Sequence, residues 1–141
     1  MVRIKPLLFA FVFLLAGVVA LQAAIPILVG TWTGTGKAVD LERGYYNVTY
    51  TVTVIDQNSR LFRGSLTMTT PTGSLTQRFT GIIKTDGTIA VNYRKHTGQK
   101  ATESASWGVY IAPTAEQPHA QYEGYWMNAS QDTGSMSLTK K

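Results

Sequence analysis

The chain has no cysteine among its 141 residues. This absence excludes a disulfide scaffold, a zinc site with thiolate ligands, an iron–sulfur cluster and a cysteine nucleophile. Histidine is almost as scarce, since only His96 and His119 occur, and a three-histidine metal site is therefore excluded as well. Charged residues make up only 15% of the chain, against about 25% in an average domain, which excludes a disordered charged tail.

Residues 1–24 have the organisation of a secretory signal peptide. Arg3 and Lys5 give a basic start, residues 7–21 form an apolar run without charge, and the small residues at 23–24 close the segment. A basic region, an apolar region and a small-residue exit are the three parts of such a peptide. We therefore expect cleavage near residue 24 and a secreted or periplasmic protein.

Cleavage leaves residues 25–141 as a single domain. Its net charge falls from +5 to +3 because Arg3 and Lys5 are removed, which is too weak for a nucleic-acid partner. The alternative is an uncleaved N-terminal anchor, because apolar character resumes at residues 25–29. Pro26 interrupts that extension, and a spanning helix needs about 20 predominantly apolar residues, so we expect no membrane-embedded part after cleavage.

The mature chain alternates between apolar and polar residues. From Tyr46 to Val54, Tyr and Val occupy every second position and are separated by Asn and Thr. A period of two is typical of half-buried strands, and turn residues divide the chain into eight such runs. The predicted strands are residues 29–36, 45–55, 61–70, 74–83, 88–94, 102–112, 119–127 and 135–140.

The short links between these strands favour antiparallel neighbours, because parallel pairing needs crossovers of a dozen or more residues. Closure of an eight-stranded sheet removes both exposed edges. We predict an all-β fold, an eight-stranded antiparallel up-and-down (meander) barrel, with a Greek-key sandwich as the alternative. An outer-membrane barrel would point its apolar side chains at lipid, and the short links and the terminal Lys140-Lys141 argue against it.

Strand parity predicts which side chains point into the barrel. The expected inward residues are Trp32, Tyr46, Val48, Tyr50, Val52, Phe62, Leu66, Met68, Leu75, Phe79, Val91, Tyr93, Trp107, Val109, Tyr122, Trp126, Met136 and Leu138. Most of them must be core, because an eight-stranded barrel has little more room than its side chains need. Inward Gly34 would leave space beside Trp32.

Some of the inward residues could line the mouth of a ligand pocket. Aromatic side chains with a polar tip suit that position, and two polar residues, Gln77 and Glu103, share the inward parity. An unpaired buried Glu103 would be costly, so the solvent-exposed rim is its alternative place. The candidate ligand-binding residues are Tyr46, Tyr50, Gln77, Tyr93, Glu103, Trp107, Tyr122 and Trp126.

The motif Gly30-Thr31-Trp32 places a Trp on the first strand, and the last strand ends at Lys140. This resembles the avidin, lipocalin and fatty-acid-binding protein (calycin) superfamily, in which a first-strand Trp plugs one barrel end and a last-strand basic residue packs across it. The resemblance makes Trp32 and Lys140 the barrel plug, with Lys141 as the second choice, and a cation over a Trp face is favourable.

The order of Asn92-Tyr93-Arg94, Trp107 and Trp126 is similar to that of avidin-type proteins. The polar positions that hold biotin in that family correspond here to Gly34, Ala38 and Met136, and the link at residues 129–134 has no capping Trp. Each missing hydrogen bond loses about 1–3 kcal/mol. We therefore expect no tight biotin binding and a more apolar ligand.

Two functions stay open. The first is an exported binding module for a small apolar or aromatic ligand; the alternative is a packed barrel that acts as a protein-interaction or inhibitor module through its loops or outer wall. We expect no enzyme and no cofactor, because the eight acidic residues are scattered and no Ser lies in a nucleophile-elbow motif. An internal cavity of hundreds of cubic ångströms would favour the first. A filled core with an exposed apolar patch would favour the second.

Overall fold

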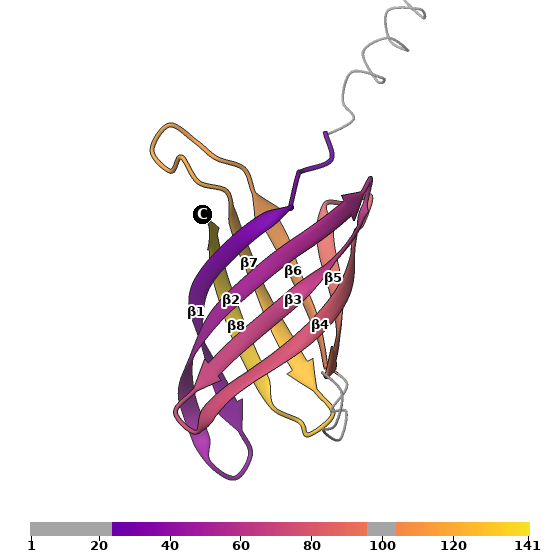
Figure 1. Cartoon of the computed structure of the whole chain (residues 1–141). Helices are drawn as coiled ribbons and strands as arrows, with labels where there is room; N and C mark the ends of the chain where they lie inside the picture. The colour runs from indigo at the N-terminus through magenta and orange to yellow at the C-terminus, as the bar shows by residue number, and fades with distance from the viewer. Residues whose placement is uncertain (1–23, 96–103) are drawn as a thin grey trace, which may run out of the picture.

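The computed structural model describes residues 24–95 and 104–141. They form a closed barrel in which eight antiparallel strands follow one another in chain order (Figure 1). The strands are β1 (Gly30–Asp40), β2 (Gly44–Asn58), β3 (Leu61–Thr70), β4 (Gly73–Ile83), β5 (Thr88–Lys95), β6 (Ser104–Ile111), β7 (Gln121–Asn128) and β8 (Thr133–Lys140). Pairing of β1 with β8 closes the sheet, which confirms the up-and-down barrel and contradicts the Greek-key alternative.

The predicted signal segment lies outside the described residues, except for its last residue. No helix in the described part of the chain is long and apolar enough to cross a membrane.

Strands β1 and β2 extend beyond their predicted ends at the hairpin that joins them. Asp40 shapes this turn, because its carboxylate accepts hydrogen bonds from the backbone N–H groups of Glu42 and Arg43. Gly44 follows with φ of 80°, a conformation that glycine adopts without strain. The turn therefore needs only residues 41–43, and both strands continue up to it.

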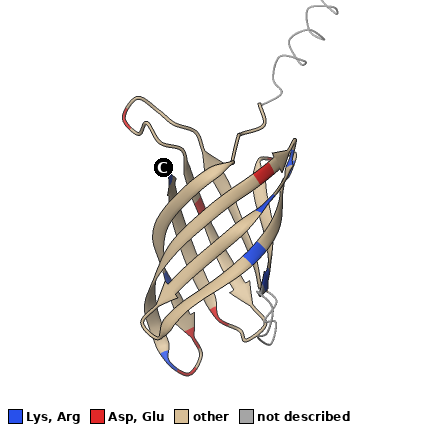
Figure 2. Cartoon of the chain, in the orientation of Figure 1, with Lys and Arg blue, Asp and Glu red and all other residues tan. Residues whose placement is uncertain are grey.

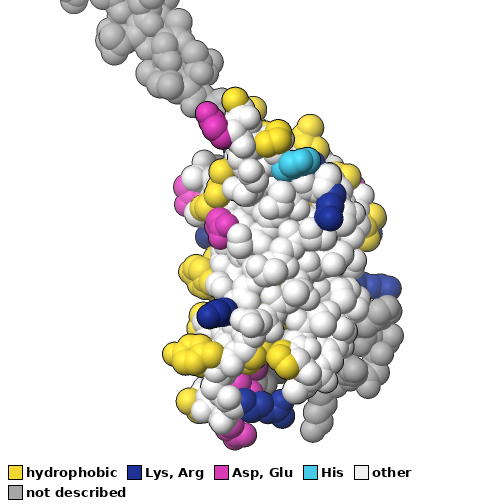
Figure 3. All heavy atoms as spheres, turned by 90° about the vertical axis from the view of Figure 1, so that its left-hand side faces the viewer, with side chains coloured by type: hydrophobic (Ala, Val, Ile, Leu, Met, Phe, Trp, Pro, Cys, Tyr) yellow, Lys and Arg dark blue, Asp and Glu magenta, His cyan; other side chains and the backbone are white. Residues whose placement is uncertain are grey.

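On most strands, side chains alternate between an apolar interior and a largely polar outer wall, as the sequence predicts. Trp32, Val48 and Met136 in the interior are 3% exposed or less. On the outer wall, Thr33 of β1 pairs with Thr51 of β2 on one side and with Thr139 of β8 on the other. The face on the β1 side of the barrel is accordingly dominated by polar side chains and backbone (Figure 3). This arrangement is the reverse of that in an outer-membrane barrel.

The prediction of inward Trp107 and Val109 on β6 was wrong. Ser106 is the buried residue there, at 1% exposed, whereas Val109 is 43% exposed. The large Tyr122 ring from β7 explains the reversal, because a Cβ added at Gly108 would overlap it. The interior beside this ring accepts only small residues at positions 106 and 108, so Trp107 and Val109 point outward, whereas Tyr110 points inward and packs against Trp32.

Candidate functional site

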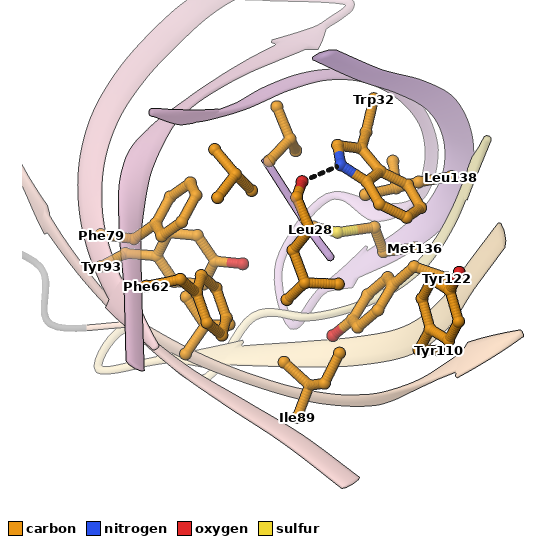
Figure 4. A pocket seen from close by; sticks show the side chains of 13 residues that line it. Leu28, Trp32, Phe62, Phe79, Ile89, Tyr93, Tyr110, Tyr122, Met136 and Leu138 are labelled. Carbon is orange, nitrogen blue, oxygen red and sulfur yellow. Dashed lines mark hydrogen bonds between the residues drawn. The ribbon is translucent and has the colours of Figure 1, made fainter. Parts of the chain in front are cut away.

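One end of the barrel is closed by the segment before β1. Leu28 is 4% exposed and lies inside the ring of strands (Figure 4). Its N–H donates to Gln57 Oε1 at 2.7 Å, and its carbonyl oxygen accepts from Trp32 Nε1 at 2.8 Å. The Lys140 ammonium lies 5.8 Å from the centroid of the Trp32 ring and donates to the Ile27 carbonyl oxygen at 3.1 Å. Trp32, Leu28 and Lys140 together form a cap of fixed geometry.

The interior beneath this cap has little free space. A cavity of about 50 Å³ lies below Leu28 and Trp32, and a second void of about 40 Å³ lies deeper, beside Tyr50 and Trp126. Small-molecule pockets usually measure about 300–1,000 Å³, whereas spaces of this size hold at most a few water molecules. Within the described residues, the barrel is a packed core.

Three of the predicted ligand-binding residues, Tyr50, Tyr93 and Trp126, have hydrogen-bond partners within the fold. Trp126 Nε1 donates to the Tyr50 hydroxyl at 2.7 Å, and that hydroxyl donates to the Ser135 carbonyl oxygen at 2.8 Å. Tyr93 shares a hydrogen bond of 2.8 Å with Ser106 Oγ. These polar tips already have partners within the fold, so their geometry is that of a structural network.

The Tyr122 hydroxyl is the exception, since it is buried without a hydrogen-bond partner among the described residues. It belongs to the lining of the 50 Å³ cavity. A buried hydroxyl beside a space of this size can be satisfied by one water molecule.

Burial sets the ionisation of the interior tyrosines. It raises the pKa of Tyr50 to about 12, although the hydrogen bond from Trp126 opposes the shift. Burial also raises the pKa values of Tyr93 and Tyr122 above the ordinary value of 10.0. The pKa of Tyr46 is raised by its partial burial and by the nearby Asp132 and Asp40 carboxylates.

Stability is therefore expected to fall at alkaline pH. Above a pH of about 10, the tyrosines of the unfolded chain release their protons, whereas Tyr50, Tyr93 and Tyr122 of the folded protein keep theirs. Each further rise in pH therefore stabilises the unfolded state relative to the folded one. The free energy of unfolding should be unaffected by these groups below about pH 10 and should decline toward pH 12. Urea denaturation across this pH range measures the effect. The Tyr50→Phe variant should show a shallower decline in the free energy of unfolding. A free energy of unfolding that does not change with pH would contradict the burial of these hydroxyls.

The other predicted site residues are dispersed. Gln77 is buried, at 6% exposed, and lines the deeper void, whereas Glu103 lies outside the described residues. Gly34 leaves no space beside Trp32, because an added Cβ would overlap the Ser137 carbonyl oxygen of the adjacent β8. Trp107 lies on the outer wall.

A larger hollow lies at the barrel end opposite the cap. It has a volume of about 580 Å³ between the turns that follow β1, β3 and β7. Half-buried Tyr46 is the one predicted ligand-binding residue in its lining, where it is joined by Met68 and Leu75 and by the charged Asp40 and Arg43.

Sequence parity missed an apolar area on the outer wall. Trp107 lies between Ala90 of β5 and Tyr125 of β7 in the strand register, and Ala90 pairs with Ile82 of β4. The Trp107 and Tyr125 ring centroids are 5.7 Å apart. We name this area the outer-wall patch; it consists of Ile82, Ala90, Trp107, Val109, Tyr125 and Met127. Four of these residues are 42–52% exposed. Gly108 and Gly124 are cross-strand partners that face inward, so the residues on either side of each glycine face outward. This glycine pair is the sequence signal that could have revealed the patch.

No three His, Asp or Glu side chains gather as metal ligands within residues 24–95 and 104–141. Comparison of the chain with protein-family models, with curated proteins and with solved structures gives no match.

Proposed function

We propose that this barrel is a protein-interaction module whose docking site is the outer-wall patch. The filled interior is the observation that supports it most, because voids of about 50 and 40 Å³ leave an apolar ligand no room inside the barrel. Among the aromatic side chains predicted to line a pocket, Trp126 and Tyr50 hydrogen-bond each other, and Trp107 faces outward, where its ring packs against that of Tyr125.

The composition of the outer-wall patch fits the centre of a protein–protein interface. Trp, Tyr and Met are enriched at interface centres, while charged residues are depleted there. The patch has both aromatic residues and Met127 side by side, whereas the wall around β1 presents threonines, as the Thr33–Thr51 pair illustrates. This contrast between two regions of the outer wall supports an interaction surface at the patch. The proposed occupant is an apolar area on another protein, because the Trp107 and Tyr125 rings lie on the outer wall of a closed barrel and can be buried only against a partner's surface.

A photoreactive residue at Val109 tests this proposal in the cells that make the protein. We expect one discrete protein adduct, and Trp107→Ser should reduce its yield about tenfold, as the loss of an interface hot spot would. Tyr45→Ser is the matched control, because Tyr45 is 84% exposed and lies outside the patch; the adduct should persist in that variant.

Two results would count against docking at the patch. One is equal loss of the adduct in the Trp107 and Tyr45 variants. The other is a small apolar ligand that raises the melting temperature of the purified protein, which would instead favour the carrier function.

The 580 Å³ hollow supports that second candidate function, a binding module for a small apolar or aromatic ligand. Its volume falls within the usual range for ligand sites, and Tyr46, Met68 and Leu75 give it an apolar side. A ligand there would bind at the open barrel end and not within the core. The residues corresponding to the biotin contacts remain Gly34, Ala38 and Met136, so tight biotin binding is not part of this proposal.

We also propose that the barrel is a calycin-like protein exported through a cleaved signal peptide. The contact between Lys140 and Trp32 across one barrel end supports the calycin relationship. The basic start and apolar run of residues 1–24 support export, and the described barrel begins just after that segment, with Leu28 as the first buried residue.

A further inference from the structure

A basic groove adjoins the outer-wall patch. It has a volume of about 490 Å³ and crosses from β2 to β5. Three guanidinium groups line it, those of Arg63, Arg78 and Arg94. Figure 2 shows basic segments on the neighbouring strands β3 and β4, with an acidic segment near the end of β2.

The strand register concentrates the positive charge. Arg78 and Arg94 are direct cross-strand partners on β4 and β5. Arg63 pairs with Thr80, two positions from Arg78 along β4, and is therefore a diagonal neighbour of Arg78. Like charges directly opposite each other destabilise a sheet. The Arg78–Arg94 pair therefore adds no stability to the sheet, which favours a role in binding an external anion.

Asp56 compensates only part of this charge. Its Oδ2 atom lies 3.1 Å from both Nε and Nη2 of Arg63. Arg63, Arg78 and Arg94 are the only charged residues in the groove lining in the described part of the chain. Among the described residues, Arg78 and Arg94 have no carboxylate partner, so both can meet an external anion.

The groove also offers neutral hydrogen-bond donors. Ser65 is the cross-strand partner of Arg78, and Asn92 is that of Thr80. All three side chains line the same groove. Its concave shape is bounded by Ile55, which lies at a break in register between β2 and β3 and is 63% exposed.

We propose that this groove binds phosphate or sulfate groups of an anionic ligand. Guanidinium groups form paired, charge-assisted hydrogen bonds with such oxyanions. A terminal phosphate or a sulfate ester group presents three acceptor oxygens, so one group can meet Arg78, Arg94 and a neighbouring hydroxyl together, whereas a carboxylate has two. This binding does not depend on protein docking at the outer-wall patch.

Calorimetric titration of the mature protein with short-chain polyphosphate and with dextran sulfate tests the proposal. Both polymers should bind at low ionic strength, and Arg78→Gln/Arg94→Gln should weaken each about tenfold or more. The control is Lys37→Gln/Lys84→Gln, which removes the same charge from two exposed residues outside the groove; it should change the affinity about twofold or less. The melting temperature of the arginine variant should not fall, because the substitution removes a like-charge pair.

Three outcomes would overturn the site. The first is no binding of either polymer by the wild-type protein. The second is an equal loss of affinity in the arginine and lysine variants, which would mean attraction by net charge alone. The third is polyglutamate that binds as tightly as polyphosphate and loses affinity in the same arginine variant, which would assign the groove to acidic proteins. Preference for polyphosphate over dextran sulfate, or the reverse, identifies which oxyanion the groove accepts.

Discussion

Replacement of Trp32 by alanine is expected to lower the free energy of unfolding by about 3–5 kcal/mol, the range for a large buried aromatic side chain. Trp32 is 3% exposed and packs edge-on against Tyr110, with ring centroids 6.4 Å apart. Its ring N–H donates a hydrogen bond to the Leu28 carbonyl oxygen. Its loss would therefore remove both the ring and the hydrogen bond that holds the cap. Urea denaturation followed by far-ultraviolet circular dichroism measures the change.

The matched control is the same substitution at Trp107, on the outer wall. Trp107→Ala loses its contact with Tyr125 but opens no internal cavity, so we expect a loss of about 1 kcal/mol or less. Trp32→Phe keeps an aromatic ring but loses the hydrogen-bond donor to Leu28. Its loss in free energy of unfolding should lie between those of the two alanine variants. Equal losses in the two alanine variants would contradict the role of Trp32 as the barrel cap.

The barrel itself is predictable from single strands. The run from Tyr46 to Val54 alternates so regularly that only one face can be the core, and the observed burial of Val48, Tyr50, Val52 and Val54 follows from it. The turn residues then divide the chain into short strands that can pair only with their neighbours. Local pattern is sufficient here because consecutive strands pair with each other, and the links between β1 and β5 contain only two to four residues each.

Strand β6 shows where local pattern fails. Its residues Trp107 and Val109 are larger than Ser106 and Gly108, so hydrophobicity alone assigns the wrong face to the core. The deciding contact is between Gly108 and Tyr122, which belongs to the next strand. Only the register between β6 and β7 reveals it, and a single strand does not contain that information.

The candidate sites required the same kind of long-range information. The free volume in the barrel depends on Leu28, which lies before the first predicted strand and is held by Gln57, 29 positions away. The basic groove depends on the pairing of Arg78 with Arg94. The sequence shows that Arg78 and Arg94 lie on the outward face of their strands, but only the pairing of β4 with β5 places them opposite each other. Neither the free volume of the barrel nor the basic groove could therefore be assigned before the strands were placed.

Gly34→Ala is expected to destabilise the barrel by more than about 3 kcal/mol, because an added Cβ would overlap backbone atoms. The obstacle is the Ser137 carbonyl group of β8, with Leu138 Cα at 2.9 Å from the same point. A flexible side chain could move aside, but these are backbone atoms of the strand pair that closes the barrel. The overlap can be relieved only if β1 and β8 separate, and the backbone hydrogen bonds between the two strands would then be lost.

Thr35→Ala is the matched control for this substitution, because Thr35 is an exposed neighbour on β1 and its truncation adds no atoms. Its free energy of unfolding should stay within about 0.5 kcal/mol of the wild-type value. Denaturation curves of the two variants, with amide exchange of β1 and β8 as a local readout, separate loss of closure from a general effect. If Gly34→Ala unfolds within about 1 kcal/mol of the wild type, the two strands are not in close contact at this point. The glycine would then leave space beside Trp32, and a ligand pocket within the barrel would again be the better explanation of its interior.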